Sequence, residues 1–191
     1  MTKASGAEPH DSGADTSGSG RTMPARTLSP GDGAGRLLLL DAPVSFWGGV
    51  DSTGTVVDRH HPRHGVRLSG RVVVMPSGKG SSSSSSVLAE HIRAGVAPAA
   101  IVLREPDMIV TLGALAAGEL YDTWVPVVVL ASADFDGLPR DGAARVEGME
   151  RGARVTLGVA LPLSVASGRA GEAAVGEQRP GPRPDPPDPD R

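Results

Sequence analysis

The chain has 191 residues, a formal net charge of −3, two Trp, one Tyr, two Phe and no Cys. The absence of cysteine excludes disulfides, thiolate zinc sites and cysteine ligation of an iron–sulfur cluster by this chain. The slightly acidic balance and the lack of a basic stripe argue against a nucleic-acid-binding protein, and the few aromatic side chains argue against base stacking.

No apolar run approaches the ~18 residues that a membrane-spanning helix needs. The start of the chain also lacks the apolar core of a signal peptide. We therefore expect a soluble, cytoplasmic protein that contacts neither membrane nor nucleic acid.

Both ends of the chain lack a hydrophobic period. Residues 1–30 are rich in Gly, Ser, Thr, Ala and Asp, and the segment from Ser167 onward alternates Pro with charge. Such segments bury too little apolar surface to offset the entropy cost of ordering them. We therefore expect disordered tails over residues 1–34 and 166–191, and one globular domain over residues 35–165.

The first elements of the predicted domain are two strands, a loop between them and a helix. The apolar run 37–40 predicts a buried strand, and the pair Gly48-Gly49 breaks regular structure after it. A polar loop follows, and the β-branched run 71–75, "RVVVM", predicts the second strand. The segment 87–95, "VLAEHIRAG", then predicts a helix that stops at its last glycine.

The alternation of strand and helix then repeats. Residues 99–103 predict a strand, 106–121 a helix and 125–130 a strand, and "AARVEG" and "ARVTLGVAL" predict two further strands without a helix between them. Apolar strands that alternate with helices indicate a parallel sheet covered on both faces. The sequence therefore predicts an α/β fold with a mixed, largely parallel sheet.

The turn between the strand 71–75 and the following helix is unusual. It is "PSGKGSSSSSS", in which Gly78 and Gly80 free the backbone, Lys79 adds a cation and Ser81 begins a run of six serines. The start of a helix at the carboxyl end of a parallel strand favours an anion, and the same field would stabilise a serine alkoxide that could abstract a proton. An exposed polyserine linker is the alternative interpretation. The order of residues does not match a Walker-type phosphate loop.

Other polar residues allow both structural and functional interpretations. His60, His61 and His64 could hold a metal, but a polar loop whose histidines hydrogen-bond locally or face substrate fits the sequence better, because no second ligand cluster completes the shell. Asp51 could cap a turn, or hold substrate or a partner. Asp107, beside Pro106, has the position of a helix start, although it could also serve with Glu105 as an acid–base pair. His91 is expected on a helix face rather than in catalysis.

Three stretches together resemble the small subunit of the aconitase X family. They are "PVSFWGGVDSTGTVVDRHHPRHG", "GRVVVMPSGKGSSSSSSVLAEHIRAGVAPAAIVLREPDMIVTLGALAAGELY" and "VPVVVL", in order, over residues 37–130. The family includes archaeal-type phosphomevalonate dehydratase and bacterial cis-3-hydroxy-L-proline dehydratase. The resemblance implies a swivelling β/β/α domain that closes over a large subunit, in which the large subunit carries the cysteines that bind an iron–sulfur cluster or iron.

The resemblance also implies roles for individual residues. The family's proton acceptor is the serine directly after the Gly-Lys/Arg-Gly turn, which corresponds to Ser81, although Ser82 or Ser83 could be better placed within the serine run. The substrate anion would be bound by the backbone and side chains of the same turn and of a facing loop: Gly78, Lys79, Gly80, Ser82, Gly48, Gly49 and Asp51. The implied function is one half of a hydro-lyase that acts on a hydroxy-carboxylate, with iron in the other subunit holding the departing hydroxyl. A non-catalytic anion-binding or regulatory module with the same fold is the alternative.

Overall fold

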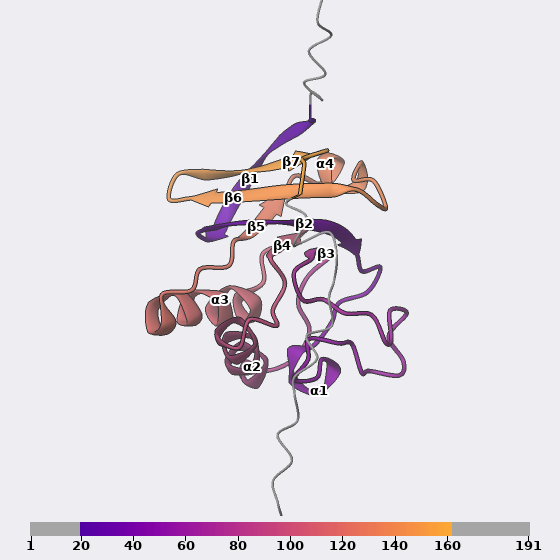
Figure 1. Cartoon of the computed structure of the whole chain (residues 1–191), viewed down its shortest axis with the longest axis vertical. Helices are drawn as coiled ribbons and strands as arrows, with labels where there is room; N and C mark the ends of the chain where they lie inside the picture. The colour runs from indigo at the N-terminus through magenta and orange to yellow at the C-terminus, as the bar shows by residue number, and fades with distance from the viewer. Residues whose placement is uncertain (1–19, 162–191) are drawn as a thin grey trace, which may run out of the picture.

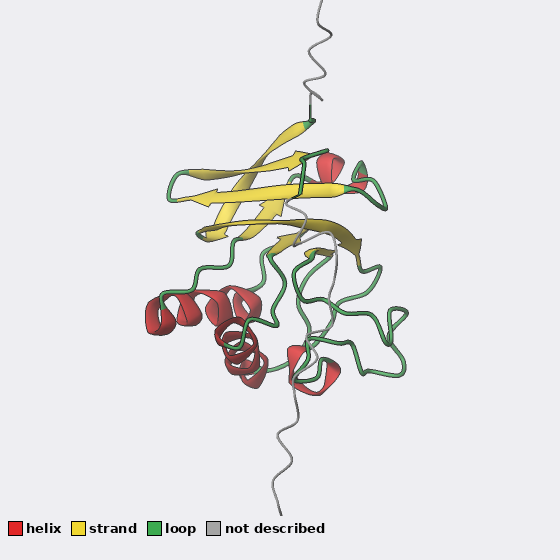
Figure 2. Ribbon diagram, in the orientation of Figure 1, coloured by secondary structure: helices red, strands yellow, loops and turns green. Residues whose placement is uncertain are grey.

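The structure is a computed structural model that describes residues 20–161. In that part of the chain seven strands form a closed barrel, and two long helices lie against one side of it (Figures 1 and 2). The elements in chain order are β1 (Thr22–Ser29), β2 (Gly31–Leu39), α1 (Phe46–Gly49), β3 (Val72–Met75), α2 (Ser82–Arg93), β4 (Ala100–Leu103), α3 (Met108–Tyr121), β5 (Val127–Leu130), α4 (Ser132–Asp136), β6 (Ala143–Met149) and β7 (Gly152–Leu157). None of the helices in this range is long and apolar enough to cross a bilayer.

The sheet is mixed, as the sequence predicts, but it is not largely parallel. Around the barrel the strands follow the order β1-β5-β4-β3-β2-β6-β7. The neighbours β2–β3, β3–β4 and β4–β5 are parallel, whereas β1–β5, β1–β7, β2–β6 and β6–β7 are antiparallel. The parallel strands are the expected α/β unit. The antiparallel strands close that unit into a barrel, which the sequence did not predict.

The globular part begins earlier than the sequence predicts. The strand β1 and the first residues of β2 lie within residues 1–34, where we expected a disordered tail. Glycines of β2 serve close packing here: a side chain on Gly33 would collide with the carbonyl of Ala99, and one on Gly35 with the carbonyl of Gly70. These glycines therefore reflect tight approach rather than disorder. Residues 1–19 and 162–191, on which the remainder of the expected tails falls, lie outside the described residues.

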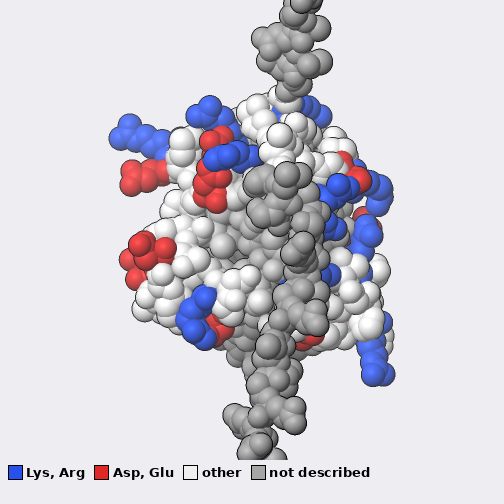
Figure 3. All heavy atoms as spheres, in the orientation of Figure 1, with Lys and Arg blue, Asp and Glu red and all other residues white. Residues whose placement is uncertain are grey.

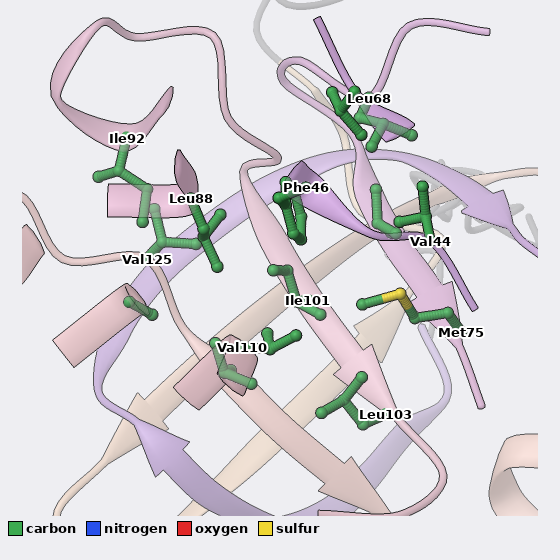
Figure 4. Packing of buried hydrophobic residues seen from close by; sticks show 14 of the residues in the cluster. Val44, Phe46, Leu68, Met75, Leu88, Ile92, Ile101, Leu103, Val110 and Val125 are labelled. Atoms are coloured by element: carbon green, nitrogen blue, oxygen red, sulfur yellow. The ribbon is translucent and has the colours of Figure 1, made fainter. Parts of the chain in front are cut away.

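Two hydrophobic cores share the parallel strands. Successive side chains of a strand point to opposite faces, and β3 and β4 are buried along their whole length. Val72, Val74 and Val102 lie in the cluster inside the barrel. The other face of the same strands contributes Met75 and Ile101 to the cluster under the helices, which Figure 4 shows together with Phe46, Leu88, Ile92 and Val110. The parallel strands are thus held on both sides, and this fixes the loops at their carboxyl ends.

Candidate functional site

The glycine–serine turn lies where β3 ends and α2 begins. Gly80 has φ +119°, a backbone conformation that a side chain would strain. A side chain there would also meet the hydroxyls of Ser84 and Ser45, 2.5 and 2.7 Å from the position of its Cβ. Ser81 follows in an extended conformation and is the N-cap residue of α2. The turn therefore requires glycine at position 80, and it sets the position of Ser81 at the end of the helix.

The predicted site residues Lys79, Ser81 and Ser82 are all exposed. The hydroxyl of Ser81 makes no capping hydrogen bond, so it is not committed to the helix. The first amides of α2 lack partners within the helix, and the first turn of α2 contains no acidic residue. The turn therefore presents hydroxyls, a lysine and the positive end of a 12-residue helix to the same region of the surface.

Gly78 lies against the start of α3. A Cβ at Gly78 would come within 2.6 Å of Oδ1 of Asp107 and 2.8 Å of a methyl group of Val110. The carboxylate of Asp107 accepts a hydrogen bond from the amide of Val110 at 2.8 Å, which confirms the helix-start interpretation of Asp107. This carboxylate is therefore engaged in capping α3, and it lies close to Gly78 of the turn.

The serine run divides into exposed and buried members. Ser84 is 1% exposed, and its Oγ lies 3.0 Å from Oγ of Ser45 and accepts a hydrogen bond from the amide of Trp47 at 3.3 Å. Ser85 is also buried, and its hydroxyl donates to the carbonyl of Ile109 at 2.8 Å. The run is therefore neither an exposed linker nor six equivalent hydroxyls, because two of its members tie α2 to neighbouring segments.

The sequence interpretation missed the roles of Ser45, Ser84 and Ser85. A signal for the buried serines was present, because a helix that begins at residue 82 places residues 84, 85, 88 and 92 on one face. Leu88 and Ile92 are buried on that face. The helical period, continued backward into the polar run, would therefore have predicted which serines face inward.

The loop after β2 contributes the facing side of the site. Ser45 donates its hydroxyl to the carbonyl of Trp47 at 2.9 Å, and Gly48, with φ +72°, is exposed. The carbonyl of Gly49 accepts a hydrogen bond from the amide of Val57 at 2.9 Å. Through Ser45 and Trp47 this loop contacts the serine turn, and Ser45 is the residue that lies against Gly80. Gly48 and Gly49 follow it in the same loop, and a contact of either glycine with substrate stays a prediction.

Asp51 forms a turn of its own. Its Oδ1 accepts hydrogen bonds from the amide of Thr53 at 2.9 Å, the hydroxyl of Thr53 at 2.6 Å and the amide of Thr55 at 3.0 Å. These bonds, above all that from the Thr53 hydroxyl, lower the pKa of Asp51. The turn-capping interpretation is confirmed, while a substrate contact by Asp51 stays a prediction.

The loop histidines do not converge on a metal position. His61 is buried, with Nε2 3.1 Å from the carbonyl of Ala42 and Nδ1 accepting from the amide of Arg63 at 3.0 Å, while His60 and His64 are exposed. Within residues 20–161 no three His, Asp or Glu side chains are grouped so that they could hold a metal ion. In the same loop a hydrogen bond from the amide of His60, at 2.9 Å, lowers the pKa of Asp58, and the charge of Lys79 lowers it further.

A groove of about 520 Å³ adjoins the site between α1 and α2. It is lined by side chains that include Trp47, which is 63% exposed, and His91, which is only 6% exposed. The ring of Phe46 meets the ring of His91 edge-on at 6.1 Å between centroids, and Nδ1 of His91 has no partner among the described residues. His91 is therefore a buried member of its helix face, as expected.

The buried hydroxyl of Ser84 should matter for stability, whereas that of its exposed neighbour should not. Ser84→Ala removes a buried hydroxyl and leaves the part-buried amide of Trp47 without its acceptor, which we expect to lower the free energy of unfolding by about 1–2 kcal/mol. Ser83→Ala, the matched control one residue earlier, should change it by less than about 0.5 kcal/mol. Urea unfolding at neutral pH measures both values, and equal effects of the two variants would contradict the assignment.

His91 should make the fold sensitive to mild acid. Burial lowers the pKa of His91, and the charge of Asp51 offsets this only in part. The unfolded chain takes up a proton on this histidine near pH 6.5, whereas the folded protein resists protonation until lower pH. The contribution of the neutral, buried His91 to the free energy of unfolding is therefore fully present above about pH 6.5. It is lost as the pH falls toward the lower pKa that His91 has in the folded protein. His91→Leu should lose less free energy of unfolding than the wild type between pH 7.5 and 5.5, as measured by urea unfolding; the same loss in both proteins would refute this.

Comparison with known proteins now defines the class of this domain. Residues 22–155 match the model of the aconitase X swivel domain, and the chain belongs to that family. The fold is similar to the crystal structure of Thermococcus kodakaraensis aconitase X in its holo-form, with TM-score 0.62 and 31% identity over 72% of this chain and 98% of that chain. The swivel fold predicted from the resemblance is therefore confirmed.

Particular relatives fall into two groups. Over 117 residues the chain is 40% identical to the phosphomevalonate dehydratase small subunit of Methanothermobacter thermautotrophicus, covering 61% of this chain and 85% of the relative. Over 114 residues it is 50% identical to the cis-3-hydroxy-L-proline dehydratase of Pseudomonas aeruginosa, covering 59% of this chain but only 20% of the relative. The chain thus matches nearly a whole small subunit in one group and about a fifth of a longer polypeptide in the other.

Proposed function

We propose that this chain is the small subunit of an aconitase X-type hydro-lyase, inactive without its large subunit, and that Ser81 is the catalytic base. The observation that carries the proposal is the position of Ser81. Its exposed hydroxyl is not used to cap α2, although it stands at the helix N-terminus beside Lys79. The names of the relatives, dehydratases and dehydratase small subunits, support the reaction class.

The reaction needs a base from this chain, and it needs a site that binds the substrate anion. A dehydratase removes a proton from one carbon and a hydroxyl from its neighbour; the electron pair of the C–H bond becomes the new C=C bond, and the hydroxide leaves as water after it receives a proton. Ser81, as alkoxide, would take the proton from carbon. The ammonium of Lys79 and the first amides of α2 favour that alkoxide, because both lower the energy of a negative charge at the end of the helix.

The same groups would bind the substrate anion. Gly78 and Gly80 let the turn pack closely against its neighbours. The exposed backbone of Gly80 and the exposed hydroxyl of Ser82 would then be offered to the anion. Gly48 and Gly49 would form the opposite wall through the loop that Ser84 holds. We propose a hydroxylated carboxylate as substrate, of the kind of phosphomevalonate or cis-3-hydroxy-L-proline, the molecules named in the relatives.

The groups that assist departure of the hydroxyl are assigned to the partner. The chain has no cysteine, and the described residues do not offer a set of ligands that fits an iron–sulfur cluster or iron. We therefore assign this cofactor to the large subunit and attribute no step of this chain's chemistry to it.

Replacing Ser81 should separate catalysis from assembly. With the large subunit, Ser81→Ala should lower kcat by at least about 100-fold, the smaller end of what a general base contributes, while the two chains still copurify. Ser83→Ala, exposed in the same run, should retain wild-type kcat. Turnover of phosphomevalonate and of cis-3-hydroxy-L-proline under anaerobic conditions is the assay.

Two results would contradict the proposal in different ways. Full activity of Ser81→Ala would refute the assignment of the base. Absence of turnover by the wild type, together with absence of a complex, would favour the alternative of a non-catalytic anion-binding or regulatory module.

A further inference from the structure

Helix α3 is more apolar than a helix on the surface of a protein should be. Among its 14 residues, "MIVTLGALAAGELY", Glu119 alone is charged. A helix that is apolar on all sides is normally buried on all sides. One side of α3 satisfies this, because Val110, Ala114 and Ala117 are buried beneath it.

The opposite side of α3 is uncovered. Met108 is 77% exposed, Leu112 54% and Leu120 70%. Their spacing in steps of four, with Ala116 between the last two, places them along one stripe of the helix. We call the exposed Met108, Leu112 and Leu120, together with the half-buried Ala116, the α3 face. In Figure 2 α3 lies at the edge of the molecule against α2, and in Figure 3 the surface on that side is uncharged between an acidic and a basic group.

The α3 face begins at the candidate site. Met108 directly follows Asp107, whose carboxylate packs against Gly78 of the glycine–serine turn. On the other side of the same turn Trp47, 63% exposed, donates its amide to Ser84. The segments that contact the turn at Gly78 and at Ser84 therefore both carry exposed apolar side chains, as expected of a surface that a second polypeptide covers around a shared site.

We propose that the α3 face docks against the large subunit that completes the active site; this inference rests on the proposed function. We choose the large subunit as the partner because the α3 face adjoins the candidate site. A chain that approaches Ser81 from outside also meets Met108. This choice is supported by the Pseudomonas aeruginosa relative, in which the matched region is only 20% of one polypeptide, so that a much larger remainder is joined to the same domain. A second copy of this chain could cover the face, but it would leave the site incomplete.

Charge placed on the α3 face tests the inference. The double variant Leu112→Glu/Leu120→Glu changes two exposed side chains, so we expect it to fold as the wild type does, as checked by circular dichroism and thermal unfolding. Its Kd for an aconitase X-type large subunit that binds the wild-type chain should rise by about 30-fold or more, the effect of a single interface hot spot. Met149→Glu is the matched control, because Met149 is 44% exposed and ends β6. In Figure 1 β6 belongs to the upper part of the barrel, whereas α3 lies below the barrel. The Kd of this control should stay within about threefold of the wild-type value.

The possible outcomes distinguish this inference from the proposed function. Wild-type affinity in the double variant, with normal turnover by the wild-type pair, would overturn the docking surface and leave the hydro-lyase intact. Self-association of this chain alone that Leu112→Glu abolishes, without any effect on the large subunit, would assign the face to a second copy and would also overturn the inference. Absence of both complex and turnover in the wild type would overturn both proposals. Selective loss of binding in the double variant would establish the face.

Discussion

The hydroxyl of Ser84 joins the two loops on which the candidate site depends. It is buried at the start of α2, close to the hydroxyl of Ser45, and it accepts the amide of Trp47. The parallel strands β2 and β3 bring these loops to the same edge of the sheet, but strand pairing alone does not set the distance between them. The buried hydroxyl does so, and Gly80 packs against both serines because it has no side chain.

This arrangement explains why serines of one run have different roles. The buried members bind α2 to its neighbours, and this rigid attachment leaves the first members free at the end of the helix, beside Lys79. An active site needs a reactive group that is exposed yet fixed in place, since misplacement by about 1 Å can reduce the rate strongly. Ser81 meets that requirement, because it is exposed while the buried contact between Ser84 and Ser45 fixes the start of α2. The apolar α3 face and the exposed Trp47 on either side of it suit a site that a second chain completes.

The parallel half of the fold was predictable and the antiparallel half was not. The runs at β3, β4 and β5 are short, apolar and β-branched, and a glycine or proline lies next to each helix between them, so hydrophobic period and turn residues were sufficient there. By contrast, β1 and the start of β2 contain Pro24 and several glycines. These strands exist because they pair with β5, β6 and β7, which are about 100 residues or more away in the sequence. The local sequence contains no information about pairing between such distant strands. The glycines that β2 needs for close packing against its neighbours also resemble the glycines of a flexible tail.

The candidate site, too, was predictable from the sequence only in part. The turn 76–81 was recognisable because its glycines, lysine and serine follow a strand and precede a helix. The tie between Ser45 and Ser84 was not, since it joins positions 39 residues apart through a contact that only the folded chain creates. For Asp51 the sequence left two interpretations open, and the hydrogen bonds from Thr53 and Thr55 establish the turn.

The most direct test of the account is a crystal structure of the two-subunit complex with a hydroxy-carboxylate bound. The account predicts that Oγ of Ser81 lies about 3–3.5 Å from the carbon that loses its proton, the separation expected for reacting atoms. It also predicts that the substrate anion lies against the turn 78–82. A ligand bound elsewhere, or one whose reacting carbon is approached by a side chain of the large subunit instead of Ser81, would contradict the account.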